Sequence, residues 1–394
     1  MHWANRLRSQ PAVTGHQDAR RSTHTIIAGL LLAAVLLPGL AWATVSYELA
    51  ERIYPSHGVV AGVAWLDSEH YLTLSLTPDG TEVSRHTYPT ASLPEPFISA
   101  NFMRQYVCGP ELAGRLSWTI SPRKNYLFFN WFTDSGNREW VLIDISGRPD
   151  FRIKRFEPPA GMQIRHALFS PDDRFVVFVH DAVNGGSDVS LLMIDLAAGV
   201  EHWRLTTEDI NFVDELWWGG AMLDAPRFWG AAKLYDGQFQ TRHGLASFDL
   251  QARECSFALG PDDILCGAEA IWGRAGCLAS TGGGLPYYLE AEIPGQSGPR
   301  QIPLSAHPVA VQALSSPGLV LLSNTTDWIT NQLWLIDVLS GDKHAIDADC
   351  AQFSLAPDGK LLVQARTSIE LRVYVPVTVE DAAIDGGEEF DYEN

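Results

Sequence analysis

HALFSPDDRFVVFVHDAVNGGSDVSLLMIDLAAGVEHWRL, residues 166–205, contains four short apolar segments separated by turns. Ser170-Pro171-Asp172 separates the first two, and Leu191–Asp195 follows a polar loop. Proline presets φ for the first central position of a turn, and Asp suits the positions beside it. The apolar segments are β-branched, aliphatic or aromatic and have no helical period. This stretch therefore predicts four consecutive antiparallel strands.

The third segment and its Gly-containing turn recur along the chain. The four clearest copies contain Asp144, Asp195, Asp249 and Asp337, which lie 51, 54 and 88 residues apart. The last interval spans two periods, and a weaker copy of the motif lies midway. The copies are residues 143–147, 194–199, 248–250, 289–295 and 336–341, with further copies at 71–76 and 371–375. The unit is thus repeated at a nearly constant spacing.

The first turn recurs in parallel with the third segment. It begins at Ser121-Pro122, Ser170-Pro171, Ser316-Pro317 and Ala356-Pro357. Unrelated hairpins of a β-sandwich would not need two turn motifs paired at one common period. Four short strands per unit of about 40–50 residues is the pattern of β-propeller blades.

We therefore predict an all-β fold: a single seven-bladed β-propeller of four-stranded antiparallel blades, with six or eight blades as alternatives. The last blade has room for only three strands, and Thr44–Leu49 would complete it and remove two exposed sheet edges. The predicted blades are residues 58–95, 114–157, 164–207, 212–258, 267–303, 309–346 and 350–379.

The two ends of the chain differ from the repeats. Residues 1–43 have the layout of a secretory signal peptide: Arg20-Arg21, an apolar stretch, and Ala41-Trp42-Ala43 before a cleavage site at Thr44. The alternative is a membrane anchor formed by residues 26–42. Residues 380–394 are acidic and predict a solvated, disordered tail. We expect an exported protein, periplasmic or extracellular, whose propeller occupies residues 44–379.

The charge of the chain limits the classes of partner. It has 47 acidic and 28 basic residues and a formal net charge of −19. Such a field repels nucleic acid and anionic lipid surfaces. We therefore expect no nucleic-acid partner, no stable membrane insertion after cleavage, and a soluble monomer.

The five cysteines allow one or two disulfides in an exported protein, with at least one thiol left over. Cys255, Cys266 and Cys277 are spaced eleven residues apart near one junction between blades. Cys255–Cys266 is the preferred pair. There is no Cys-x-x-Cys, so a zinc ribbon or a thioredoxin-type redox site lacks its sequence signal.

The turn-plus-strand pattern at residues 170–179, followed by Leu192–Gly199, resembles the WD-like repeat of TolB-like periplasmic proteins. It is also similar to the propeller of prolyl-oligopeptidase-type peptidases. The resemblance is specific near residues 116–147, 166–199 and 351–375. Those families use the repeat for docking or gating, and Thr44–Tyr54 is too short for their additional domains. The resemblance therefore implies the fold and the compartment, and not their activities.

A second resemblance concerns one repeat only. Asp195, Gly199 and Trp203 fit the spacing of pyrroloquinoline-quinone-type propeller repeats, in which the Trp docks between blades. After Gly147 and Gly341 the docking position holds Phe151 and Ala345 instead. We therefore expect related blades without a quinone, and no cofactor of any kind.

Catalytic motifs are mostly missing. The sequence has no Gly-x-Ser-x-Gly, His-Glu-x-x-His or Gly-x-x-x-x-Gly-Lys. We predict no catalytic residues and no metal site. The loops joining second to third strands gather at one mouth of a propeller channel, and loops on a rigid scaffold carry recognition. The candidate binding residues in these loops are Trp131, Asp134, Arg138, His180, Asp181, Arg242, His243, Asp327 and Trp328.

Other roles for these residues stay open. The two tryptophans would be exposed anchors or, alternatively, packing residues between blades, and the histidines would be solvated groups or acid–base groups. The predicted function is a non-catalytic binding or scaffold module for a protein or cell-envelope component. The alternative is a propeller enzyme of the lactonase, lyase or quinoprotein type with a site in the central channel.

The leader gives the first testable prediction. Exported protein should begin at Thr44, because small residues stand at both recognition positions before it. Intact-mass measurement of the exported protein should show the loss of residues 1–43. Retention of residues 26–42 would contradict cleavage and favour the anchor.

Overall fold

The computed structural model divides into two compact units, residues 46–377 and a smaller unit made of the two chain ends. The structure describes residues 44–379, and between 202 and 286 it describes only the course of the backbone. Residues 1–43 and 380–394 lie outside it. The internal gaps are 56–57, 91, 109–115, 133–137, 157–160, 183–188, 208–211, 219–226, 236–240, 250–253, 258–262, 272–273, 282–286, 292, 294–295, 299, 315–317, 326–330 and 367–368.

Five four-stranded sheets follow one another along the chain, and in each the strands lie in sequence order. Every printed strand pair in them is antiparallel, so each sheet is a meander joined by hairpins. The first sheet is β2 (Val59–Trp65), β3 (His70–Thr77), β4 (Gly80–Thr87) and β5 (Glu95–Ile98). The second is β6 (Leu116–Ile120), β7 (Tyr126–Phe132), β8 (Arg138–Asp144) and β9 (Arg152–Phe156).

The next three sheets repeat this order. The third is β10 (Met162–Phe169), β11 (Phe175–Ala182), β12 (Val189–Asp195) and β13 (Val200–Thr207). The fourth is β14 (Phe212–Trp218), β15 (Arg227–Tyr235), β16 (Thr241–Asp249) and β17 (Glu254–Phe257). The fifth is β18 (Asp263–Ile271), β19 (Arg274–Thr281), β20 (Tyr287–Ala291) and β21 (Arg300–Leu304).

The last sheet has seven strands, in the order β1-β27-β26-β25-β24-β23-β22. Its long strand β25 pairs β24 up to Cys350 and pairs β26 from Cys350 onward. Division at Cys350 would give two four-stranded blades, and the count of seven stays a prediction. The strands are β1 (Thr44–Ile53), β22 (His307–Ala313), β23 (Leu319–Thr325), β24 (Asn331–Asp337), β25 (Lys343–Leu355), β26 (Leu361–Ala365) and β27 (Leu371–Val379).

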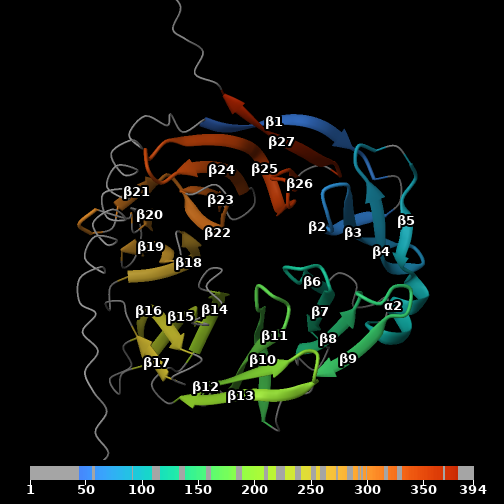
Figure 1. Ribbon diagram of the computed structural model, residues 1–394, viewed down its shortest axis with the longest axis horizontal. Helices are drawn as coiled ribbons and strands as arrows, with labels where there is room; N and C mark the ends of the chain where they lie inside the picture. Colours follow the sequence, from blue (N-terminus) through green and yellow to red (C-terminus); the bar gives the residue numbers. More distant parts are fainter. Residues whose placement is uncertain are drawn as a thin grey trace, which may run out of the picture. The chain divides into compact units, whose positions relative to one another are not determined.

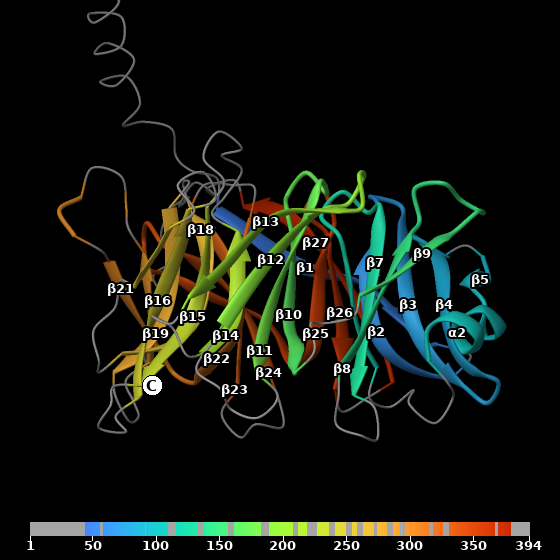
Figure 2. The same ribbon diagram turned by 90° about the horizontal axis from the view of Figure 1, so that it is seen from below.

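Within residues 46–377 the sheets follow one another around a central axis (Figures 1 and 2). First strands of consecutive sheets contact each other, as in β10 with β14, β14 with β18 and β18 with β22. The last sheet meets the first, because β2 contacts β25 and β26. The strand order places β1 on the outer edge of β27, which confirms that the segment beginning at Thr44 completes the last sheet.

Strands such as β7, Tyr126–Phe132, are apolar on both faces because each sheet packs between two others. Leu127 and Phe129 belong to the cluster shared with the first sheet, whereas Phe128 belongs to the cluster shared with the third. Full burial of one such side chain contributes about 1.5–3 kcal/mol. The nearly continuous apolar run YLFFNWF is therefore what this position between two sheets requires.

The repeated Ser-Pro turn joins neighbouring sheets. In two of these turns the serine hydroxyl accepts a hydrogen bond from the backbone N–H of the next strand, at 3.0 Å from Tyr126 to Ser121 and 2.8 Å from Phe175 to Ser170. The Ser121 hydroxyl also donates to the buried carboxylate of Asp173, 2.6 Å away in the next sheet. Both serines thus close their own hairpins, and Ser121 also links its hairpin to the next sheet.

Arg372 of β27 holds the bend of β25. Its guanidinium donates to both carboxylate oxygens of Asp347, at 2.8 and 3.0 Å, and the Tyr374 hydroxyl donates to the same carboxylate at 2.7 Å. Arg372 also bonds Glu370, which accepts at 3.0 Å from Arg52 of β1. One network therefore ties β25, β27 and β1 together. Its charges are paired, as buried charges must be.

Two details of the sequence interpretation were wrong. The copy at residues 71–76 lies in β3, the second strand of its sheet and not the third. The helix α2 (Ala100–Tyr106) was not expected. It begins after Ser99, whose hydroxyl accepts from the backbone N–H of Phe102 at 3.3 Å. Seven helical residues after a capping serine are too few to give a periodic apolar signal.

We expect the Arg372→Met variant to be destabilised by about 3–5 kcal/mol, because it would leave the buried Asp347 carboxylate without its cation. Urea unfolding would measure this loss. The matched control is Arg174→Met, whose pair with Asp195 is exposed and should contribute at most about 1 kcal/mol. Equal stability of the two variants would contradict a structural role for the network.

The same network sets a pH dependence. Burial alone would raise the pKa of Glu370, but hydrogen bonds from Arg372 and Tyr54 and the nearby positive charges hold this pKa below its ordinary value of 4.5. A carboxyl with a depressed folded-state pKa stabilises the fold above its unfolded pKa and loses that contribution as the pH falls. The free energy of unfolding of Glu370→Gln should therefore fall less steeply below pH 4.5 than that of wild type, and acid unfolding would measure the difference.

Candidate functional site

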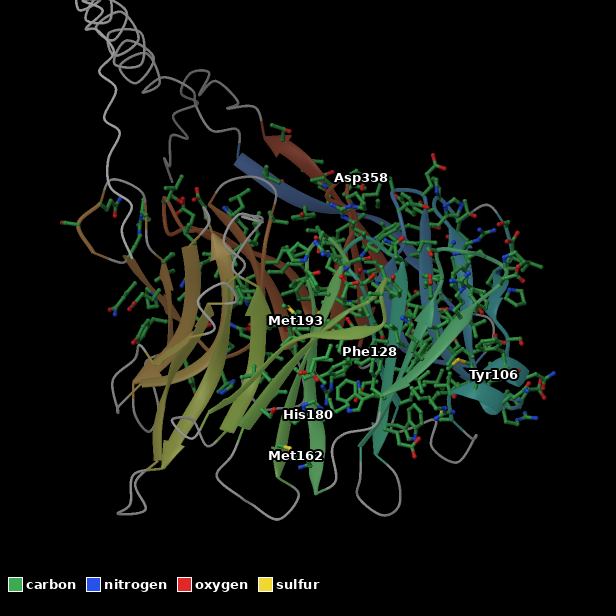
Figure 3. All side chains as sticks on the ribbon, turned by 60° about the horizontal axis from the view of Figure 1, so that its bottom comes forward. Tyr106, Phe128, Met162, His180, Met193 and Asp358 are labelled. Atoms are coloured by element: carbon green, nitrogen blue, oxygen red, sulfur yellow. The ribbon has the colours of Figure 1, made fainter. Side chains whose placement is uncertain are left out.

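The predicted binding loops do join second to third strands. The hairpins β7–β8, β11–β12, β15–β16 and β23–β24 occupy this place in their sheets. Strand pairing continues further than the sequence indicated, with Phe132 opposite Arg138 and Asp181 opposite Val189. Figure 3 shows His180 beside Met162 toward one side of the ribbon and Asp358, in a first-to-second turn, toward the other.

Two of the candidate binding residues are buried at the base of these hairpins. Trp131 is 2 % exposed and packs in the core between the first and second sheets. The exposed placement is therefore wrong for Trp131, and the alternative, packing between sheets, is right. His180 is 1 % exposed on β11 and lies near Phe178, so it is not a solvated loop residue. Both side chains belong to sheets that pack between two neighbouring sheets.

The side chains of the other candidate binding residues lie outside the described part of the chain. The backbones of Arg138, Asp181, Arg242 and His243 lie in strands, and their side chains are outside the described part. Asp134, Asp327 and Trp328 lie wholly outside it. Their binding role stays a prediction.

The structure describes the side chains of two of the five cysteines. Cys108 and Cys350 are both buried, and Cys350 is a free thiol. Burial, reinforced by Asp347 and Asp349, raises the pKa of Cys350 to about 12, so this thiol is protonated at neutral pH. Cys255 and Cys266 lie on β17 and β18, and the disulfide between them stays a prediction because their side chains are not described.

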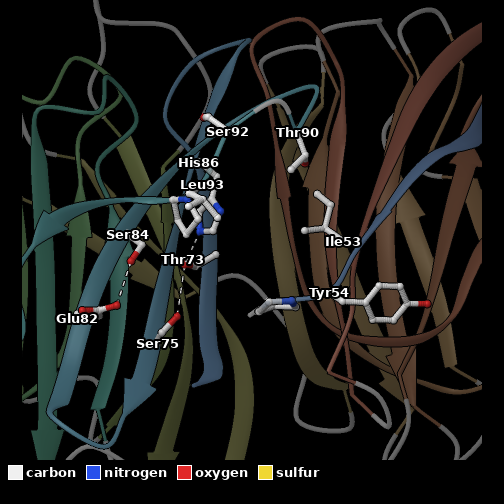
Figure 4. Close-up of a pocket in the computed structure, with 12 residues that line it drawn as sticks. Ile53, Tyr54, Thr73, Ser75, Glu82, Ser84, His86, Thr90, Ser92 and Leu93 are labelled. Carbon is white, nitrogen blue, oxygen red and sulfur yellow. Dashed lines mark hydrogen bonds between the residues drawn. The ribbon is translucent and has the colours of Figure 1, made fainter. Parts of the chain in front are cut away.

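A pocket of about 210 Å³ with one polar wall and several apolar lining residues, which the sequence did not indicate, lies between the first sheet and β1. In Figure 4, side chains of β3 and β4 form one wall; Ile53, at the end of β1, lies opposite, and Tyr54 follows it with its ring turned away from that wall. The connection from β4 to β5 supplies Thr90, Ser92 and Leu93. The full lining is Ile53, Tyr54, Pro55, Thr73, Ser75, Glu82, Ser84, His86, Thr90, Ser92, Leu93 and Pro94.

Strand alternation puts the polar wall together. In YLTLSL, residues 71–76, every second side chain faces one side, so Thr73 and Ser75 share a face while Leu72 and Leu74 enter the core toward the second sheet. On β4, Ser84 lies opposite Thr73 and Glu82 lies opposite Ser75. The face toward the last sheet is therefore polar. The alternation of polar and apolar residues along β3 could have predicted a polar face, but it does not indicate that this face lines a pocket.

The polar side chains form short hydrogen-bonded chains. The Ser75 hydroxyl donates to Thr73 at 3.4 Å, and Thr73 lies 2.9 Å from the Nε2 atom of His86. The Ser84 hydroxyl donates to a carboxylate oxygen of Glu82 at 3.3 Å. His86 stacks on Tyr71 with ring centroids 4.7 Å apart. Burial lowers the pKa of His86 to about 4, so the imidazole is neutral at physiological pH.

This arrangement suits binding better than bond-breaking chemistry. Thr73 is adjacent to an imidazole, but its side chain is buried, at 1 % exposure, in the middle of a strand. A nucleophile must reach its substrate, and a general base works best with a pKa near the operating pH. No group of three or more His, Cys, Asp or Glu side chains that could hold a metal occurs among the residues that the structure describes.

The comparisons with known proteins show the fold and nothing finer. No protein-family model matches the chain, and no curated protein sequence matches it. An oligogalacturonate lyase from Vibrio parahaemolyticus superimposes with a TM-score of 0.58 at 7 % identity, covering 86 % of this chain and 98 % of that one. The β-propeller domain of the Trilobed protease from Pyrococcus furiosus gives 0.53 at 10 % identity, covering 83 % and 99 %.

The chain is a β-propeller protein. The tricorn protease also matches, with a TM-score of 0.51 at 11 % identity over 84 % of this chain and 34 % of that one. This propeller therefore shares its fold with both lyases and proteases, and identities this low carry no activity across. The part of the chain that the structure describes contains no helix long and apolar enough to cross a membrane.

Trp131→Ala should destabilise the propeller by about 3–5 kcal/mol, because it would leave a cavity in the core between the first two sheets. Urea unfolding would measure the change. Ile369→Ala, at an exposed position, is the control and should stay within about 0.5 kcal/mol of wild type. A stable Trp131→Ala protein would show that this side chain is not a packing residue.

Proposed function

We propose that this protein is an exported, non-catalytic propeller that binds a protein or cell-envelope component through the end of the ring formed by the second-to-third hairpins. The observation that carries the proposal is the position of the four hairpins. All of them join corresponding strands of sheets that run in one order around the axis. The leader at residues 1–43 supports export.

The bases of these hairpins support a binding role. Strand pairing reaches the last described residue beside three of the four loops, as in Tyr235 opposite Thr241 and Thr325 opposite Asn331. Buried side chains such as Trp131 and His180 anchor two of the bases. Loops that emerge from a rigid base can form a partner surface at a small entropic cost.

The charge of the chain indicates the kind of partner. With a formal net charge of −19, the protein attracts cationic or neutral surfaces and repels polyanions. The enzyme alternative draws on the lyase among the structural relatives. An oligogalacturonate is a polyanion, and the described pocket contains no Lys or Arg to receive it. A basic or neutral protein surface fits the field better.

The hairpin tips can be tested directly. We would replace residues 133–137 in one variant and 326–330 in another with Asn-Gly, the preferred two-residue hairpin turn. Affinity capture from a cell-envelope extract with quantitative mass spectrometry should show at least a tenfold loss of the main partner in both variants.

The control is a double variant at the opposite end of the sheets, Asp150→Ala with Asp342→Ala, both in third-to-fourth turns and exposed. It should capture the partner as wild type does. Circular dichroism melting curves would verify that all three variants fold. Equal capture by the wild type and both hairpin variants would overturn the proposed binding end, and turnover of a substrate by the pure protein would overturn the non-catalytic role.

A further inference from the structure

We propose that the pocket between β1 and the first sheet binds a small neutral polyhydroxylated molecule of single-sugar size. None of its lining residues belongs to the four candidate hairpins, and the pocket lies at the seam where the ring closes. Its polar wall comes from β3 and β4, and Ile53, at the end of the closing strand, lies opposite that wall (Figure 4). The proposal therefore does not depend on the function proposed above.

The volume sets the size of the ligand. Pockets for drug-sized ligands measure about 300–1,000 Å³. The described pocket has about 210 Å³, the space of about seven water molecules at roughly 30 Å³ each. One sugar ring or a short polyol fits this space. A peptide or an oligosaccharide would extend beyond it.

The hydrogen-bonding groups of the wall match alcohol groups. Ser75, Thr73 and Ser84 present hydroxyls, which both donate and accept, and the neutral His86 has one donor and one acceptor nitrogen. The carboxylate of Glu82 accepts only, and among the described residues it bonds Ser84 alone. A polyol offers donors and acceptors on every carbon, so it can use all of these groups at once.

The charge of the lining excludes other small ligands. Glu82 is its single charged group, and no Lys or Arg lines the pocket. An anionic ligand would face that carboxylate without a counter-ion. A neutral alcohol is not repelled by the carboxylate and does not require a full charge to be desolvated. It can still donate a charge-assisted hydrogen bond to the carboxylate.

The contrast with the other face of the same strands indicates that the polarity is not a packing requirement. Leu72 and Leu74 are fully buried in the apolar core toward the second sheet. Ser75 and Ser84 are almost as buried on the opposite face, beside open volume. Burying hydroxyls costs free energy unless they are hydrogen-bonded. These hydroxyls already bond one another, His86 or Glu82, and a hydroxylated ligand can use the donors and lone pairs that remain, which an apolar ligand cannot.

Binding should also stabilise the seam. A ligand that contacts both walls binds the closed ring better than a chain in which β1 has detached. It therefore stabilises the closed form by an amount that rises with ligand concentration relative to the dissociation constant. The backbone N–H of Thr90 already bonds Glu51 of β1 at 3.4 Å, so the two walls are linked at the rim.

The test is titration of the full chain with glucose, xylitol and glucuronate, followed by saturation-transfer NMR and thermal unfolding. The neutral probes should bind with dissociation constants of order 1 mM and raise the unfolding temperature. Glucuronate should bind at least tenfold more weakly than glucose. In Glu82→Gln that difference should shrink, because the repelling charge is gone.

Ser84→Ala and Thr73→Val should each weaken glucose binding about tenfold, and their circular dichroism should match that of wild type. Ser190→Ala is the matched control, because Ser190 is an equally buried strand hydroxyl in another sheet. Its glucose affinity should be unchanged. The proposal is overturned if no neutral probe binds, if glucuronate binds as well as glucose, or if the pocket variants bind glucose like Ser190→Ala.

Discussion

The ion network around Arg372 is the constraint on which ring closure depends. A propeller built from meandering sheets must join its last sheet to its first, and here the joining segment is a single bent strand, β25, followed by β26, β27 and β1. Arg372 bridges the carboxylates of Asp347 and Glu370, and Arg52 carries the same network to β1. Replacing Arg372 would leave the buried Asp347 carboxylate without its cation, which costs much more than an exposed ion pair contributes.

The closure also creates the pocket between β1 and the first sheet. The first three sheets meet through apolar clusters, such as the one that joins Phe128 to Phe178. At the seam, an apolar cluster with Trp65 and Leu362 gives way to a wall of hydroxyls around Thr73. The end of β1 covers that wall from the opposite side. A ligand at this place would therefore report on whether the ring is closed.

The repeated turns predicted most of the fold, because local chemistry determines them. Ser-Pro turns and alternating strands depend on a few neighbouring residues, and they located the sheets to within a few positions. The bend of β25 at Cys350 was not predictable, since it depends on partners more than 20 residues away in β27. Trp131 was misplaced for a related reason: hairpin pairing continues past it, and nothing local distinguishes a tryptophan at a loop from one in a core. The pocket needed both walls, and they are distant in the sequence.

The same fold serves several kinds of function in other proteins, whereas closure of the ring by β1 can be measured on this chain directly. The measurement is amide hydrogen exchange on the full chain, read separately for residues 46–53 and 371–377. If β1 closes the sheet, both segments should be protected and should lose protection together, in wild type and to a greater degree in Arg372→Met. Rapid exchange throughout 46–53 beside a protected β27 would contradict the closure and, with it, the second wall of the pocket.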